Sequence, residues 1–161
     1  MRLEGSCRCG AVAFRCDAYA PAPYLRCYCS ICRKTDGGGG FAINLGASAG
    51  SLEVDGAEHV AVYSAVIDGR QSAAERRFCR RCGSALWVSD PSWPDLVHPF
   101  ASAVDTPLPP PPHSVHMMLE DKPEWVRADI RDGDTTHQGY PDQSLRDWHA
   151  AHGLLDDGGP G

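Results

Sequence analysis

The chain has 161 residues, of which 42% are hydrophobic and 22% are charged, a composition typical of a globular domain. Its formal net charge of -6, with no basic arm, argues against general nucleic-acid binding. No apolar run is long enough to span a bilayer, and the N-terminus lacks the apolar stretch of a signal peptide. We therefore expect a cytoplasmic protein with neither membrane nor nucleic acid as a partner. The sequence leaves its oligomeric state open.

Short segments that alternate apolar and polar residues predict strands along most of the chain. These segments span residues 10–16, 40–45, 51–54, 60–63, 75–78, 84–88, 115–119 and 125–130. The proline run at residues 107–112 predicts a stiff connecting loop. Residues 142–152, between Pro141 and Gly153, predict a short C-terminal helix. The sequence therefore predicts a mainly β protein built from small antiparallel sheets.

A few large or polar side chains can be placed from the same pattern. Trp87 and Trp125 lie in strand-like segments and are expected in the core. Cys16 ends an alternating segment and is expected to be a small buried hydrophobic residue. His149 and His152 lie on the predicted helix and are expected to face solvent.

The cysteines carry the strongest functional signal. Seven of the eight fall into three tight clusters, Cys7-x-Cys9, Cys27-x-Cys29-x-x-Cys32 and Cys79-x-x-Cys82. Such spacing is typical of zinc sites, because neighbouring ligands must converge on one ion about 2.3 Å from each sulfur. Disulfides are disfavoured, because a reducing cytosol keeps thiols free and a Cys-x-Cys pair cannot readily bridge to itself. The clusters therefore predict metal binding.

Two of the clusters predict a closed zinc site. Cys7 and Cys9, two residues apart in an extended segment, present their sulfurs on the same face. Cys79 and Cys82 have the spacing of a zinc knuckle, and Gly83 can adopt the left-handed conformation that the turn requires. Together they predict a structural zinc site with four cysteine ligands, whose metal binding is coupled to folding. We expect this zinc to staple a single β domain over residues 1–155, followed by a flexible tail over residues 156–161.

Cys27, Cys29 and Cys32 form the second centre. Three thiolates leave one coordination position of zinc open, which is the arrangement of a catalytic site. The alternative is a structural site with a fourth protein ligand. The candidates for that ligand are Cys16, His59, His98, His113 and His116. Three thiolates on Zn²⁺ carry a net charge of -1, and Arg33 and Lys34 are placed to balance it or to bind the carboxylates of an anionic substrate.

Several motifs carry a resemblance to a known family. Residues 5–12, 27–34 and 78–84 hold the ordered cysteine motifs, and residues 116–125 form a late His…Lys-Pro-x-Trp segment. Together they resemble the glutathione-dependent formaldehyde-activating enzyme family. The resemblance implies an Mss-type β-fold held by zinc, similar to small nucleotide-exchange chaperones. It also implies that the four-cysteine set holds structural zinc and that the three-cysteine set holds catalytic zinc.

The resemblance further implies a carbon–sulfur lyase that reversibly joins a small thiol, glutathione, to a small aldehyde, formaldehyde. Of the two roles for zinc, we favour activation of the thiol over polarisation of the carbonyl. Tyr28, Ser30 and His116 are candidate proton shuttles. A zinc-stabilised binding module and a thiol-redox protein remain alternatives. Residues 89–114, which include Trp93 and His98, depart from the family pattern, and glutathione specificity depends on whether they line the substrate pocket.

Overall fold

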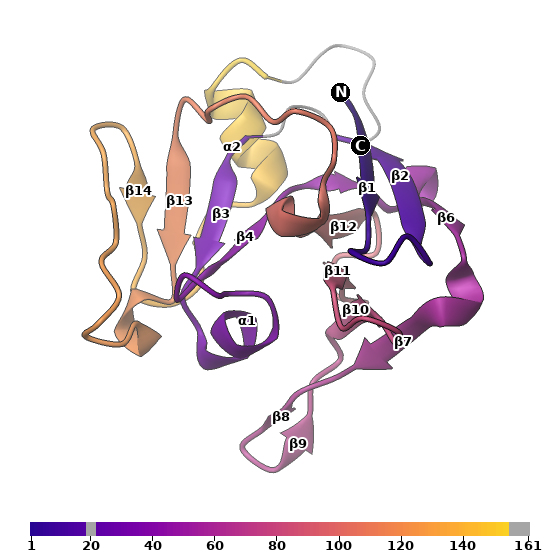
Figure 1. Ribbon diagram of the computed structural model, residues 1–161. Coiled ribbons are helices and arrows are strands. Elements are labelled where there is room, and N and C mark those ends of the chain that lie inside the picture. The colour runs from indigo at the N-terminus through magenta and orange to yellow at the C-terminus, as the bar shows by residue number, and fades with distance from the viewer. Residues whose placement is uncertain (19–21, 155–161) are drawn as a thin grey trace.

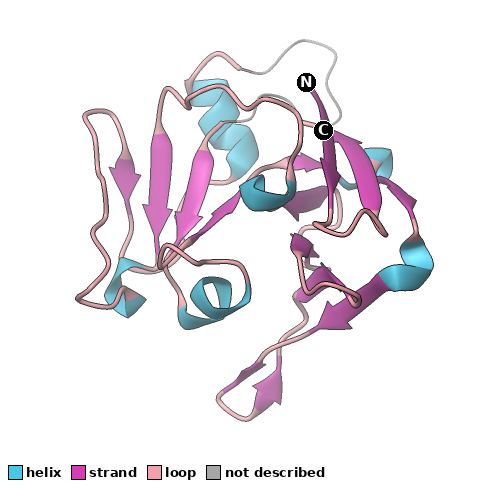
Figure 2. Cartoon of the chain, viewed as in Figure 1, coloured by secondary structure: helices cyan, strands magenta, loops and turns pink. Residues whose placement is uncertain are grey.

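A computed structural model of the protein describes residues 1–18 and 22–154. Strands dominate this part of the chain, and its helices are short (Figure 2). The strands form four sheets, of which three are antiparallel and one is mixed. The mainly β fold predicted from the sequence is therefore confirmed. The predicted tail, residues 156–161, lies outside the described residues.

The first sheet contains the N-terminus of the chain. Its strand order is β1 (Arg2–Ser6), β2 (Ala13–Asp17) and β6 (Glu53–Asp55), all antiparallel. Leu3, Phe14 and Cys16 alternate with more exposed neighbours and point into the core, as the period of two requires. The burial of Cys16 confirms its predicted place as a small core residue.

The second sheet is antiparallel throughout and has five strands. They are, in spatial order, β5 (Ala47–Ser48), β12 (Leu96–Pro99), β11 (Ala85–Ser89), β10 (Glu75–Cys79) and β7 (Val60–Tyr63). Trp87 on β11 is buried, as predicted, and its ring meets that of Phe14 edge to face with centroids 5.4 Å apart. This aromatic pair packs the first two sheets together. A separate hairpin of β8 (Val66–Ile67) and β9 (Arg70–Gln71) projects from the body (Figure 1).

The third sheet is mixed. Its strands are β14 (Thr135–Thr136), β13 (Ser114–Met117), β3 (Tyr24–Cys27) and β4 (Ala42–Asn44). Strand β13 runs parallel to both β14 and β3, whereas β3 and β4 are antiparallel. The parallel pair of β3 and β13 joins segments far apart in the chain, because a tight hairpin can connect only antiparallel strands. Alternation along the sequence carries no signal of this pairing.

The helices sit at the margins of the sheets. The α-helices are α1 (Ser30–Thr35) and α2 (Leu145–Ala151), and the 3-10 helices are η1 (Ala49–Ser51), η2 (Ala57–His59), η3 (Ala101–Ala103) and η4 (Leu119–Asp121). Helix α2 is the predicted C-terminal helix. It begins after Ser144, whose hydroxyl accepts a hydrogen bond from the Asp147 N–H at 3.1 Å and so caps the first turn. Within the described residues, no helix is both long and apolar enough to cross a membrane.

Three predictions near the C-terminus were wrong. The segment at residues 125–130 forms no strand, and Trp125 is 67% exposed rather than in the core. A turn directs the neighbouring Val126 inward instead, where it packs against Gly40. His149 is buried rather than solvent-facing, because its Nε2–H donates to the Ala22 carbonyl at 2.6 Å. His152 is exposed, as expected.

The mixed sheet and the five-stranded sheet are joined by Phe100. Its side chain is fully buried among Cys27, Cys32 and Val88. Its backbone N–H donates to the Leu86 carbonyl at 3.0 Å, which extends the five-stranded sheet toward the mixed one. Phe100 therefore forms the floor beneath one of the cysteine clusters.

Candidate metal centres and their cavity

Four cysteines from distant parts of the chain meet at one edge of the molecule. Cys7 and Cys9 lie in the turn after β1, while Cys79 ends β10 and Cys82 lies in the turn that follows. Gly83 adopts a φ of 77° in this second turn, and its N–H donates to the Cys79 carbonyl at 2.8 Å. The left-handed conformation predicted for Gly83 is thus present, and the Cys7–Cys9 and Cys79–Cys82 pairs meet.

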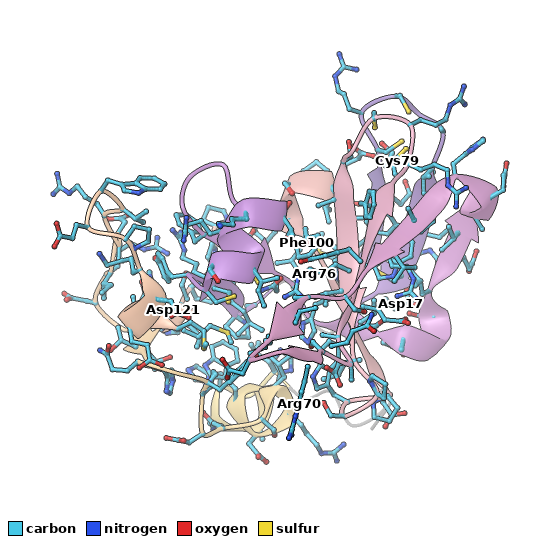
Figure 3. The ribbon with its side chains drawn as sticks, turned by 90° about the horizontal axis from the view of Figure 1, so that it is seen from below. Asp17, Arg70, Arg76, Cys79, Phe100 and Asp121 are labelled. Carbon is cyan, nitrogen blue, oxygen red and sulfur yellow. The ribbon has the colours of Figure 1, made fainter. Side chains whose placement is uncertain are left out.

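The sulfur positions fit a tetrahedral zinc site. The four sulfurs all lie within 4.8 Å of one another, with separations of 3.6 Å for Cys7–Cys9 and 3.8 Å for Cys9–Cys79. Tetrahedral zinc with bonds of about 2.3 Å requires sulfurs about 3.8 Å apart. A disulfide would require about 2.05 Å, and all eight cysteines are free. Figure 3 shows the sulfurs gathered beside Cys79.

Cys82 is prepared for thiolate formation by a serine. The Ser84 hydroxyl lies 3.2 Å from the Cys82 sulfur. This hydrogen bond, together with one from the Ser84 backbone, lowers the pKa of Cys82 to about 5. Ser84 also accepts the Arg8 N–H at 3.0 Å, which links the two turns. The cluster therefore fastens the first sheet to the five-stranded sheet.

The three-cysteine cluster forms where β3 leads into α1. Cys27 ends β3, Cys29 is the N-cap of α1, and Cys32 lies in the first helical turn. The Cys32 N–H donates to the Cys29 sulfur at 3.4 Å, the bond that an N-cap side chain ordinarily accepts. Helix α1 was not predicted from the sequence. Its first turn directs the three sulfurs toward one point.

The three sulfurs also fit a metal ion, but with one ligand fewer. They lie within 4.8 Å of one another, and no fourth histidine, cysteine or acidic ligand joins them among residues 1–18 and 22–154. Hydrogen bonds from Cys27 and Cys32 lower the pKa of Cys29 to about 2, while hydrogen bonds with Cys29 and Cys32 raise the pKa of Cys27. One thiolate thus forms readily, and further ionisation calls for a cation among the sulfurs.

The candidate fourth ligands lie in other environments. Cys16 belongs to the core of the first two sheets, and His59 lies beside Glu58. The His113 ring lies near that of His152, and His116 lies in a buried hydrogen-bonded chain described below. His98 lines the same cavity as the three sulfurs without joining their cluster.

A large cavity opens onto the three-cysteine cluster. It has a volume of about 930 Å³, and all three cysteines line it. One wall is the face of the five-stranded sheet that carries Arg76, Val88 and His98, three residues paired across β10, β11 and β12. Side chains directly opposite in an antiparallel sheet point to the same face, so the three form a row. The opposite wall belongs to the mixed sheet and includes Leu25 and Met117.

Arg76 supplies the positive charge beside the three sulfurs. Its Nη2 donates to the Cys32 sulfur at 3.6 Å, and Figure 3 places it between α1 and the five-stranded sheet. Its Nε is buried and has no hydrogen-bond partner among the residues that the structure describes. The sequence carried no signal for this residue, because alternation alone cannot show which charged strand residue reaches across to another sheet.

We expect the Arg76→Gln variant to bind metal at the three-cysteine cluster about 10- to 100-fold more weakly, since partners of metal ligands have effects of this size. Arg76→Lys should recover part of the loss, because it restores the charge. Competition with a chromophoric chelator measures the affinity. Arg70→Gln, on the projecting hairpin, is the matched control and should bind metal as the wild type does. Equal affinities in the Arg76 and Arg70 variants would contradict the assignment.

His98 lines the cavity and, within the described residues, keeps one ring nitrogen free to accept a hydrogen bond. Its Nδ1–H donates to the Leu45 carbonyl at 3.0 Å, which fixes the tautomer and leaves Nε2 without a proton. Desolvation by burial lowers the pKa of His98 to about 4, so the imidazole is neutral near pH 7. The Trp93 ring packs edge-on against it with centroids 4.7 Å apart. Both residues line the cavity, so the segment over residues 89–114 does contribute to its wall.

Arg33 and Lys34 face a different cavity. They line a polar space of about 660 Å³ together with Arg8 and Asp36, next to Cys7 of the four-cysteine cluster. Helical geometry explains this placement, because residues one and two positions after Cys32 point away from the face that Cys32 occupies. Their binding of a substrate stays a prediction.

The candidate proton shuttles form a buried chain behind the cluster. The Tyr28 hydroxyl lies 2.8 Å from His116 Nδ1, and His116 Nε2 lies 3.3 Å from Asp134 Oδ2. Tyr28 and His116 are fully buried, and neither lines the cavity. Since Tyr28 lies between two of the cysteines, this chain anchors the cysteine segment from behind. Ser30, the third candidate, is an exposed first residue of α1.

Comparison with known proteins agrees with this arrangement. Residues 2–120 match the model of the family described as glutathione-dependent formaldehyde-activating enzyme. The chain belongs to this family. A Halomonas elongata protein whose name places it in the same family is 61% identical over 154 residues, which cover 96% of this chain and 98% of that protein. A crystal structure of a Rhodobacter sphaeroides protein aligns with a TM-score of 0.53 at 30% identity, covering 66% of this chain and 91% of that one.

The match to the family model ends at residue 120, before the last segments that line the cavity. All seven clustered cysteines, Arg76 and His98 lie within the matched residues. The third wall of the cavity lies outside the matched residues. It is formed by side chains of the segment from β14 to α2, within residues 135–137 and 140–148. The cysteine clusters are thus built from the part that the family model matches, whereas the cavity is completed by the segment beyond it.

Proposed function

We propose that this family member is a zinc-dependent carbon–sulfur lyase that reversibly adds a thiol to a small aldehyde. Glutathione and formaldehyde, the pair in the family's description, are the first candidates. The observation that carries the proposal is the three-sulfur cluster on the wall of a large cavity, with no fourth protein ligand among the described residues. Such a centre has room for an incoming reactant.

In this proposal the two cysteine clusters have different tasks. Cys7, Cys9, Cys79 and Cys82 hold a structural zinc, and their closed set supports this role. Cys27, Cys29 and Cys32 hold the catalytic zinc. When bound there, zinc supplies Lewis acidity that favours the thiolate form of a thiol at its open position.

The side chains around the cavity complete the site. Arg76 offsets the negative charge of the three thiolates by its contact with Cys32. His98 Nε2, neutral and without a proton, can accept a hydrogen bond from the hydroxyl group of the product. The S–C bond forms as the carbonyl π bond breaks, and the proton ends on the new hydroxyl group. The reaction consumes no oxidant or reductant. We place it in the cytosol, where thiols stay reduced, and assign it to one domain over residues 1–155.

Metal removal tests the proposal. We expect the protein as purified to contain two zinc ions per chain and to accelerate exchange between glutathione, formaldehyde and their adduct, measured by NMR exchange spectroscopy. Selective removal of the more labile zinc should reduce the enzymatic rate to the uncatalysed background, and added zinc should restore it.

The comparison must include the uncatalysed reaction, because thiols add to formaldehyde without an enzyme. A Cys16→Ala variant is the matched control, since Cys16 is buried outside both clusters and should keep both zinc ions and the full rate. A zinc-loaded wild type that exchanges the adduct no faster than buffer would refute the proposed reaction with this pair.

A further inference from the structure

The cavity beside the three cysteines has mostly apolar walls. The register explains the five-stranded side, where Val88 pairs with Arg76 and His98, and Leu96 lies two residues before His98 on the same face. On the mixed sheet, Leu25 pairs with Val115, and both line the cavity. Apolar side chains from two facing sheets thus approach the reactive sulfurs.

The charges of the cavity do not suit a strongly anionic ligand. Among the described residues that line it, Arg76 is the sole arginine or lysine, and it already contacts the Cys32 sulfur. Asp90 adds a negative charge to the same wall. The more basic side chains, Arg33 and Lys34, face the other cavity.

The segment beyond the family match closes the apolar space. Leu145 and Trp148 of α2 line the cavity, and Leu145 packs closely on Gly46, where an added Cβ would lie 2.9 Å from Leu145 Cδ1. Trp148 is buried, with 4% of its surface exposed. Formaldehyde, with two heavy atoms, fills only a small part of a cavity of about 930 Å³.

We propose that the aldehyde substrate carries an apolar body of about the size of a phenyl ring, which lies between the two sheets and against α2. This inference rests on the proposed addition of a thiol to an aldehyde and names the class of aldehyde. The thiol sulfur bonds to the carbonyl carbon, the π electrons become the O–H bond, and the thiol proton moves to that oxygen. His98 Nε2, the unoccupied acceptor on the same wall, accepts a hydrogen bond from the hydroxyl of the product.

Unreactive alcohols test the apolar site without any turnover. We expect 3-phenylpropan-1-ol to bind the zinc-loaded protein about 10- to 100-fold more tightly than propan-1-ol, as burial of a phenyl group predicts. Saturation-transfer NMR titration measures both affinities. Trp93→Ala should remove most of the difference, because Trp93 lines the cavity. Trp125→Ala, at a tryptophan 67% exposed and outside the cavity, is the matched control and should retain it.

Melting curves serve to check that the Trp93→Ala variant folds, and Leu145→Ala provides a second change in the same walls. Equal binding of the two alcohols to the wild type would overturn the inference, as would equal phenyl preference in the Trp93 and Trp125 variants. Adduct exchange, followed with glutathione and either 3-phenylpropanal or formaldehyde, separates the two proposals. A preference for formaldehyde overturns the inference and leaves the proposed function standing. Phenyl-dependent binding without exchange of either adduct overturns the proposed function and supports the apolar site.

Discussion

A Cys79→Ser variant is expected to lose the cooperatively folded state. Cys79 is fully buried and belongs to the cluster that fastens two sheets together. Structural zinc contributes about 10–16 kcal/mol in zinc-finger peptides. The total stability of a domain is about 5–15 kcal/mol, so the loss of this site exceeds what the remaining core can offset. Circular dichroism melting and zinc content per chain measure the effect, and strong chelation of the wild type should reproduce it.

The control for this variant is Cys16→Ala, which also removes a fully buried cysteine but leaves both clusters intact. It should unfold cooperatively and retain two zinc ions. If Cys79→Ser melted at the wild-type temperature with its zinc lost, the four-cysteine cluster would have no structural role.

A Cys32→Ser variant is expected to lose activity while it keeps its fold. The change removes one of three sulfurs that line the cavity and breaks the contact with Arg76. We expect zinc content to fall from two ions to one per chain and the rate of adduct exchange above background to fall by at least ~10³, since metal activation contributes several kcal/mol. The melting curve should remain cooperative, because the four-cysteine cluster is untouched.

Metal analysis, melting and exchange spectroscopy on the same preparation check this prediction together. Loss of the folded state in Cys32→Ser would contradict the division of tasks between the clusters. Full activity with one zinc ion would remove the three-cysteine cluster from the reaction altogether.

The cysteine pairs could be found from the sequence because their chemistry is local. Ligands two or three residues apart, such as Cys79 and Cys82, fix the turn between them, and only the pairing of distant turns had to be inferred. The three-cysteine cluster is equally local, since the end of β3 and the start of α1 lie next to each other in the chain. Strand positions followed from alternation for the same reason, as in β7 and β11.

What the sequence pattern missed depends on contacts between distant segments. Arg76 is one charged residue among several on β10, and only the packing of two sheets brings it to Cys32. Trp125 was wrongly placed in the core because alternation shows only which residues share a face, whereas a turn exposes it. His149 was placed in solvent because its partner, the Ala22 carbonyl, lies 127 residues away.

Strand β10 has five residues and touches both cysteine clusters. Arg76 contacts Cys32, and Cys79, three residues later, belongs to the four-cysteine set. Loss of metal from the four-cysteine site would therefore loosen β10. This strand carries Arg76, whose positive charge is needed at the three-cysteine site. If both sites hold zinc as proposed, we expect the four-cysteine site to fill first and the three-cysteine site to empty first under partial chelation. We expect a chain with only the three-cysteine site loaded to be the least populated of the four loading states.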